Sequence, residues 1–310
     1  MHPAFSILFF TTLAGAAQGL VFTLALAVLF GLELSPGFIG IALGVAEVLL
    51  VAGLAASFMH LGRKTRAWRA VLMWRTSWMS REVIVLPAFI ALVALWAVSL
   101  RLGIGAPWSW AMPVLVLYGA ALLWYCTAMI YACLRFIEEW AHPLTVINFT
   151  LIGLSSGLML ACAMAALAGE ARFVHVFGPW ALAATLAAWA ARGSALRRNA
   201  GLRHKSTLQS ATGIRADKLV QKSMGMSAGS FNTREFFHGA SLVALKNMKF
   251  GFLVMAFALP AALALWGVVS AVAWPWLLAV LVQAPGLLAE RWFFFAQAKH
   301  PQNLYYQVVS

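Results

Sequence analysis

A histidine and a glutamate stand at the two ends of a basic, tryptophan-rich segment that reads HLGRKTRAWRAVLMWRTSWMSRE, from His60 to Glu82. The segment lies between two long apolar runs, so both residues are expected at membrane ends of helices, on the same side. An imidazole that donates to a carbonyl oxygen and a carboxylate that takes or passes a proton suit two-electron, two-proton quinone chemistry. A pair that only satisfies itself at a helix junction is the alternative interpretation.

Basic residues alternate with tryptophan between His60 and Glu82. The spacing of Trp68, Leu72 and Arg75 predicts a short amphipathic helix along the membrane interface, with its indoles at headgroup depth. Taken one by one, most of these side chains fit an ordinary interfacial anchor equally well. The segment holds six of the 22 Lys and Arg residues and three tryptophans, namely Arg63, Lys64, Arg66, Arg69, Arg75, Arg81, Trp68, Trp74 and Trp78.

The composition places these residues in a membrane protein. Of 310 residues, 63% are hydrophobic and 10% charged, far outside the usual range of soluble domains. Apolar runs of roughly 20 residues are long enough to cross about 30 Å of hydrocarbon as helices. The sequence therefore predicts an all-α, polytopic bundle of eight transmembrane helices in one membrane domain, residues 1–310. The eight runs lie at about 5–30, 38–59, 83–100, 111–134, 144–168, 174–191, 250–270 and 274–297.

The net charge of +13 is first a topology signal. The loops after the second, fourth and sixth runs and the C-terminal tail hold nearly all Lys and Arg, whereas the opposite loops offer only Arg101 and Arg172. By the positive-inside bias, the basic loops and both termini are expected in the cytoplasm. The polar loop 193–248 suits a docking surface for a soluble partner or a solvated linker. The charge is accounted for without nucleic acid.

Three cysteines and seven histidines raise the question of metals and haem. Cys126, Cys133 and Cys162 all lie inside apolar runs without metal-ligand spacing, which predicts small buried side chains and no metal site. Only His60 and His142 are expected at membrane ends on the same side, and no histidine lies deep in a span. Haem is therefore not expected.

Three further ionisable residues lie within apolar runs. Glu47, near the centre of the second run, is costly in hydrocarbon unless it is paired, protonated or facing water, so it is a candidate for a proton path. A protonated carboxyl bonded to a neighbouring helix is the alternative. Glu290 and Arg291 are adjacent and should not share a helix face. Glu290 is expected to face the bundle and Arg291 a lipid phosphate or a partner.

Several stretches resemble a known family. His60-Leu61-Gly62, Arg66-Ala67-Trp68 and Ser80-Arg81-Glu82 resemble the membrane anchor subunit of dimethyl sulfoxide reductase. The opening MHPAFSILFFTTLAGAAQGL, the stretch HPLTVINFTLIGLSSG and the ending ERWFFFAQAKHPQNLYY are similar to the branch that includes the membrane subunit of cytoplasmic sulfite dehydrogenase. Together these stretches span the chain.

The resemblance implies a quinone-binding subunit of the bacterial inner membrane without a prosthetic group of its own. It would anchor an iron-sulfur subunit that relays electrons to or from a molybdopterin catalytic subunit. In that family a His at the end of the second helix and a Glu at the start of the third are implicated in quinol binding, and they correspond to His60 and Glu82. Arg66, Trp68 and Arg81 are transferred as neighbours within the matched motif.

Two other functions remain open at the level of sequence. A proton-coupled secondary transporter would use Glu47 and Glu82 as coupling carboxylates, although such proteins usually have inverted repeats and broken helices that this sequence lacks. A purely structural membrane tether would need neither His60 nor Glu82. Direction of electron flow is not determined by this subunit, since sulfite oxidation reduces quinone and sulfoxide reduction oxidises quinol.

Overall fold

The computed structural model describes residues 4–59, 61–203, 205–220 and 239–301. In this part of the chain eight helices are long and apolar enough to cross a membrane, and no strand occurs, which confirms the predicted all-α class. The spans are α1 (Phe5–Leu29), α2 (Pro36–Met59), α3 (Trp78–Arg101), α4 (Trp108–Ala132), α5 (Pro143–Ala168), α6 (Ala171–Ala200), the continuous trio α9 (Leu242–Leu253), η3 (Val254–Ala258) and α10 (Leu259–Ser270), and α11 (Trp274–Ala296). Among the described residues, two short helices lie between spans, η1 (Lys64–Met73) and α7 (Leu208–Thr212).

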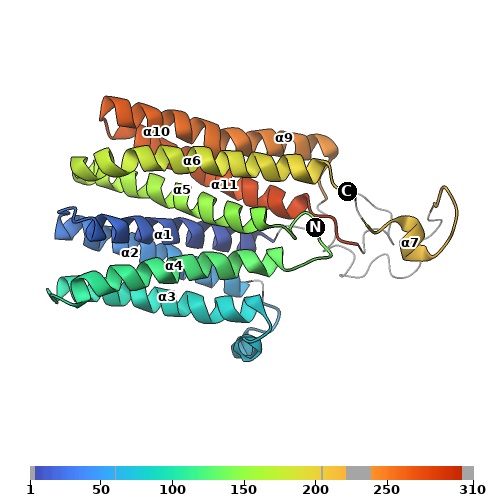
Figure 1. Cartoon of the computed structure of the whole chain (residues 1–310), viewed down its shortest axis with the longest axis horizontal. Helices are drawn as coiled ribbons and strands as arrows, with labels where there is room; N and C mark the ends of the chain where they lie inside the picture. Colours follow the sequence, from blue (N-terminus) through green and yellow to red (C-terminus); the bar gives the residue numbers. More distant parts are fainter. Residues whose placement is uncertain (1–3, 60, 204, 221–238, 302–310) are drawn as a thin grey trace.

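The spans lie side by side, with α1 and α5 near the middle of the bundle (Figure 1). α1 contacts α2, α4, α5 and α11, so it joins the half built from α2, α3 and α4 to the half built from α6 and α9 to α11. Large apolar side chains such as Ile41, Val48 and Leu95 are exposed on the outside of the bundle. Helices that are apolar on every side are expected where lipid covers one face and protein the other.

Small residues let α1 and α5 approach closely. A side chain at Gly157 would overlap the backbone of Gly19, and one at Gly19 would overlap the carbonyl of Gly153. This contact is the small-residue helix packing typical of membrane proteins. It places the polar residues of α1 next to those of α5.

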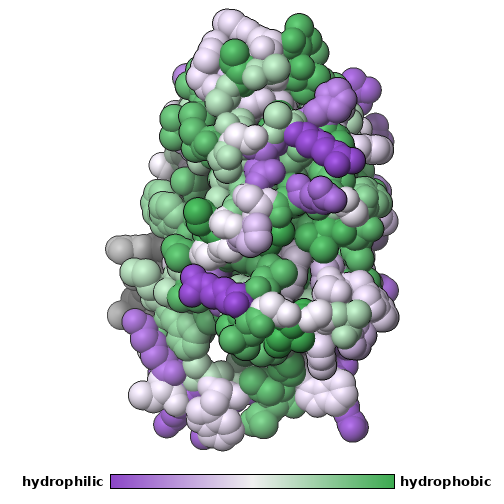
Figure 2. All heavy atoms as spheres, turned by 90° about the vertical axis from the view of Figure 1, so that its left-hand side faces the viewer, coloured by the Kyte–Doolittle hydropathy of each residue, from purple (hydrophilic) through white to green (hydrophobic). Residues whose placement is uncertain are grey.

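One end of the bundle, which we call the basic end, holds η1, α7, the start of α1 and the end of α11 (Figure 1). η1 is seen end-on beside horizontal spans, so it lies across the bundle axis, as an interfacial helix should. The predicted amphipathic helix is therefore present, in 3₁₀ form. Figure 2 looks onto the opposite end, where hydrophilic side chains are scattered among apolar ones.

The polar loop is shorter than the sequence suggested. α6 continues to Ala200 and α9 begins at Leu242, so both ends of the predicted loop 193–248 are helical. Arginines at positions 192, 197 and 198 end the apolar run without ending the helix, because arginine is a good helix former. A smaller correction concerns Cys133, which is exposed, whereas Cys126 and Cys162 are buried.

Candidate functional site

A cavity of about 520 Å³ lies at the basic end, between η1 and the ends of four spans. We call it the outer cavity. Most of its lining is apolar, and its polar groups come from Ser57, Lys64, Thr65, Glu82 and Tyr131. A volume of this size, an apolar wall and a few convergent polar groups are the usual properties of a small-molecule site. The remaining lining residues are Ile7, Phe10, Leu54, Phe58, Leu61, Ala67, Trp68, Ala70, Met79, Val83, Leu86, Pro87 and Ile130.

Glu82 is the carboxylate of the outer cavity. α3 begins at Trp78, because the Ser77 side chain accepts a hydrogen bond from the backbone N–H of Ser80. The third apolar run was placed at about 83–100, so the helix begins about five residues earlier than the sequence predicted. Glu82 lies one turn into α3, is only 8% exposed, and accepts a hydrogen bond from the Thr127 hydroxyl of α4. A carboxylate in such apolar surroundings is a candidate for proton chemistry.

The other predicted neighbours have different positions. Trp68 lines the outer cavity from η1, whereas Arg66 is exposed and is not among the described residues that line it. Arg81 holds the turn between η1 and α3: its Nε donates to the Trp74 carbonyl at 2.9 Å and its Nη2 to the Arg75 carbonyl at 2.8 Å. Its guanidinium lies 4.1 Å from the centre of the Trp78 ring. Arg81 thus positions η1 over the cavity.

Two predicted residues are not joined to this site. His60 lies outside the described residues, although Phe58 and Leu61 on either side of it in the sequence both line the outer cavity. Glu47 is half-buried within α2 and is not among the described lining residues. The roles predicted for His60 and Glu47 stay predictions.

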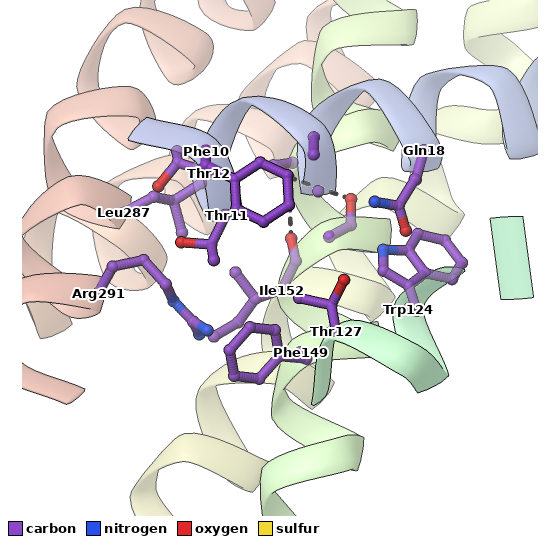
Figure 3. A pocket seen from close by; sticks show the side chains of 14 residues that line it. Phe10, Thr11, Thr12, Gln18, Trp124, Thr127, Phe149, Ile152, Leu287 and Arg291 are labelled. Atoms are coloured by element: carbon purple, nitrogen blue, oxygen red, sulfur yellow. Dashed lines mark hydrogen bonds between the residues drawn. The ribbon is translucent and has the colours of Figure 1, made fainter. Parts of the chain in front are cut away.

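A second, much smaller cavity of about 20 Å³ lies inside the bundle, behind Glu82, and we call it the inner cavity. Figure 3 shows polar side chains from α1, α4 and α11 converging on it, among them Thr12, Gln18, Thr127 and Arg291. Thr127 belongs to both sites, since it lines the inner cavity and donates to the carboxylate of the outer one.

Arg192, Glu290 and Arg291 form a buried charged cluster between α6 and α11. Glu290 Oε1 lies 2.6 Å from Arg192 Nε, and Glu290 Oε2 accepts a hydrogen bond from Arg291 Nε at 2.6 Å. All three residues are at most 3% exposed. Arg291 also lies over the ring of Phe149, with its guanidinium carbon 4.1 Å from the ring centre.

This cluster corrects the expectation for Arg291, which faces neither lipid nor a partner. α11 contacts α5 and α1 as well as α9 and η3, so neighbouring positions on α11 both face protein. Arg192 was not singled out, because it follows the apolar part of its run. Thr127 and Tyr131 were missed as well, since each is an ordinary polar residue inside an apolar run and nothing local marks it. Tyr131 packs in an aromatic cluster with Trp140, Phe149, Phe294 and Phe295.

Comparison with known proteins adds two findings. A family described as "DMSO reductase anchor subunit (DmsC)" matches residues 1–220, which include η1 and Glu82. The C subunit of the sulfite dehydrogenase of Allochromatium vinosum is 47% identical over 335 aligned positions that cover 100% of both chains.

Proposed function

Because this chain belongs to the family of DMSO reductase anchor subunits, and is thus a multi-pass membrane anchor subunit of an oxidoreductase, we propose that it binds quinone in the outer cavity. There it passes electrons between an iron-sulfur subunit and the quinone pool. Glu82 and His60 are the groups proposed to bind the quinone oxygens and to exchange protons with them. Trp68 covers the ring from η1.

The observation behind this proposal is a buried carboxylate in the wall of a large apolar cavity at the membrane end of the bundle. A quinone head is a flat apolar ring with two carbonyl oxygens, so it needs an apolar slot and one or two hydrogen-bonding groups. The outer cavity has room for such a ring, at about 520 Å³, and Glu82 stands on its wall. Quinone reduction takes up two protons with two electrons, and a carboxylate held by a neutral hydroxyl, that of Thr127, is free to exchange a proton.

The family also implies partner subunits for catalysis and electron transfer. We propose that these are an iron-sulfur subunit and a molybdopterin subunit that dock at the basic end, since electrons tunnel only over short distances and the outer cavity opens there. From the positive-inside bias we expect the basic end on the cytoplasmic side of the inner membrane. The similarity to a sulfite dehydrogenase protein favours sulfite oxidation over sulfoxide reduction, with electrons flowing into quinone.

A structural tether without a quinone site is the competing proposal, and it predicts that substitutions at His60 and Glu82 are harmless once the complex has assembled. A proton-coupled transporter would act alone in liposomes, without copurifying subunits. The tether does not call for an apolar cavity beside a buried carboxylate. A transporter would have its coupling carboxylates near the middle of the membrane, whereas Glu82 lies one turn into α3 at the basic end.

The test uses membranes that contain the intact complex and a fluorescent hydroxyquinoline N-oxide, an inhibitor of quinol sites. His60→Ala and Glu82→Gln are each expected to weaken inhibitor binding about 5- to 150-fold, because a buried hydrogen-bonding group that loses its partner costs about 1–3 kcal/mol. Copurification of the partner subunits should be unchanged.

The matched controls are His175→Ala and Glu33→Gln, two exposed residues at the opposite end of the bundle. Both are expected to bind the inhibitor as the wild-type protein does. Wild-type affinity in His60→Ala and Glu82→Gln, with assembly intact, would remove the site from the outer cavity and support the tether.

A further inference from the structure

The inner cavity collects buried polar atoms that the protein itself leaves unsatisfied. In the described part of the chain, Thr12 Oγ1, Gln18 Oε1 and Trp124 Nε1 are buried without a hydrogen-bond partner, and all three residues line this one cavity. Figure 3 shows Thr12, Gln18 and Trp124 around the cavity, with Thr127 between Trp124 and Arg291. Buried polar atoms are nearly always paired with protein or ordered water.

The inner cavity has the size of a water site. Its volume of about 20 Å³ exceeds the roughly 10–15 Å³ that one water needs, and three unsatisfied polar atoms are within the usual two to four partners. A water there would also lie beside the Thr127 hydroxyl, whose hydrogen is donated to Glu82 and whose oxygen is available as an acceptor.

Arg291 connects this cavity to a third one, which we call the edge cavity. Its volume of about 10 Å³ is at the lower limit of the space that one water needs. Asn148 Oδ1 and Arg192 Nη2 are buried without a hydrogen-bond partner among the described residues, and both side chains line the edge cavity. The same cavity reaches half-buried His142 and Arg198, which lie at the basic end where α5 begins and α6 is near its end. It is therefore the outward continuation of the inner cavity.

We propose that ordered waters in the inner and edge cavities, together with Thr127, form a proton route from Glu82 through the bundle to the aqueous phase at the basic end. The inference rests on the proposed function, and it adds a path separate from the opening through which quinone enters. Such a path is needed because a quinone ring bound in the outer cavity would separate Glu82 from the water outside.

Each transfer along the route makes one O–H bond and breaks another. When quinol is oxidised, Glu82 accepts a proton from it, and the electrons leave to the electron-transfer subunit of the proposed function. Once Glu82 is protonated, the Thr127 hydroxyl turns from Glu82 toward the inner water. Glu82 then passes a proton to the Thr127 oxygen while the Thr127 hydroxyl proton moves to the inner water. The inner water passes a proton to the edge water past Arg291, and the edge water releases a proton to solvent. Quinone reduction runs the same steps in reverse.

The charged cluster lies along this route without closing it. Guanidinium groups do not give up protons in proteins, so Arg192 and Arg291 act by orienting water. Glu290 pairs with both arginines, and Glu139 adds a second carboxylate to the lining of the edge cavity. An uncompensated arginine would repel protons.

The experiment replaces Thr127 in the intact complex and separates proton transfer from binding. Thr127→Val keeps the shape and removes the hydroxyl, and it is expected to lower kcat for a short-chain quinone at least about tenfold, since a positioned proton-transfer group typically contributes about 10²–10⁴-fold. KM and the affinity for the hydroxyquinoline N-oxide should stay within about twofold of wild type. The solvent deuterium isotope effect on kcat should rise, and Thr127→Ser should restore both kcat and the isotope effect.

Two variants make the outcome unambiguous. Thr23→Val removes a buried hydroxyl that bonds only to the carbonyl of Gly19, and it should leave kcat unchanged. Gln18→Leu removes a polar wall of the inner cavity while Thr127 and Glu82 stay in place, and it should lower kcat as Thr127→Val does. Wild-type kcat and isotope effect in both Thr127→Val and Gln18→Leu, with the inhibitor bound normally, would refute the route and leave the quinone site standing. Failure of the wild-type complex to bind the inhibitor would refute both.

Discussion

At the scale of single residues, the buried charges of α6 and α11 need one another. Glu290 is fully buried and lies between two guanidinium groups, so its carboxylate compensates the desolvation of both arginines, and they compensate its own. Removing one partner from a buried ion pair is far more destabilising than replacing the whole pair with apolar residues. The cluster is therefore expected to be intolerant of single changes.

Glu290→Gln is expected to destabilise the protein by about 3–5 kcal/mol, because it leaves Arg192 and Arg291 buried without a counter-charge. Thermal unfolding of the detergent-solubilised complex measures the loss, with Glu33→Gln, an exposed change, as the control. The triple variant Arg192→Met, Glu290→Leu and Arg291→Met should lose less stability than the single one. A single variant as stable as wild type would contradict the buried-pair argument.

His142 makes stability depend on pH. Its Nδ1 accepts the backbone N–H of Leu144 at 3.1 Å and so caps α5, which requires the neutral ring. Burial, and then the positive charge of Arg198, lower the pKa of His142 below its ordinary value of 6.5. The folded protein thus binds this proton more weakly than the unfolded chain does. The contribution to stability is complete above 6.5 and is lost as the pH falls toward the lowered folded-state pKa.

The unfolding temperature of the complex should therefore decrease between about pH 7 and pH 5, and His142→Asn should reduce this decrease. Asparagine keeps a side-chain acceptor for the Leu144 N–H but does not titrate. His175→Asn, a change at an exposed position, is the control and should keep the wild-type slope. An unchanged slope in His142→Asn would assign the pH dependence to other groups.

At the scale of the elements, the contact of α1 with α5 determines the shape of the interior. Gly157→Ala is expected to destabilise the protein by about 1–3 kcal/mol, because the added methyl group overlaps the backbone of Gly19 and must push the helices apart. Gly44→Ala is the matched control: a methyl group there meets nothing within 4 Å, so stability should be unchanged or slightly higher. Equal stabilities of the two variants, in unfolding of the solubilised complex, would argue against the close contact.

The number and type of the elements could be predicted because apolar runs long enough to span a bilayer leave the backbone no alternative to a helix. The last residue of α6 and the first residue of α9 could not be predicted, because arginine, lysine and serine lower the local hydropathy without ending the helix. Hydropathy reports where lipid ends, whereas hydrogen bonding decides where a helix ends.

In the candidate site, too, some residues could be predicted from the sequence and others could not. Glu82 and Trp68 stood out because a carboxylate and an indole beside a basic turn are conspicuous in the sequence. Thr127 and Arg192 did not, because their importance comes only from what they meet in space. Thr127 meets Glu82 across 45 positions of the sequence, and Arg192 meets Glu290 across 98 positions, taken as 290 minus 192. Arg81 was expected near the quinone, which stays a prediction, and its hydrogen bonds to the turn beneath η1 could not be predicted from the sequence.

At the scale of the whole molecule, the distribution of charge predicts how the bundle sits in the membrane. In a background without the three native cysteines, Ser210→Cys on α7 should react with an impermeant thiol reagent only in inside-out vesicles, and Glu33→Cys only in intact cells. This expectation follows from the positive-inside bias, which predicts that the basic end lies in the cytoplasm. Both positions are exposed and lie at opposite ends of the bundle. The reverse labelling pattern would place the partner subunits outside the cytoplasm.

The rim of the outer cavity includes exposed apolar side chains, Phe58 of α2 at 42% and Met79 of α3 at 54%. In a membrane these side chains lie against acyl chains, so the cavity opens sideways as well as toward η1. A ligand with a long isoprenoid tail then never has to leave the bilayer: the tail stays among the lipids while the head moves a few ångströms into protein. The occupancy of the cavity by such a ligand would depend on the mole fraction of the ligand in the membrane and on its two-dimensional diffusion. It would not depend on the concentration of the ligand in water.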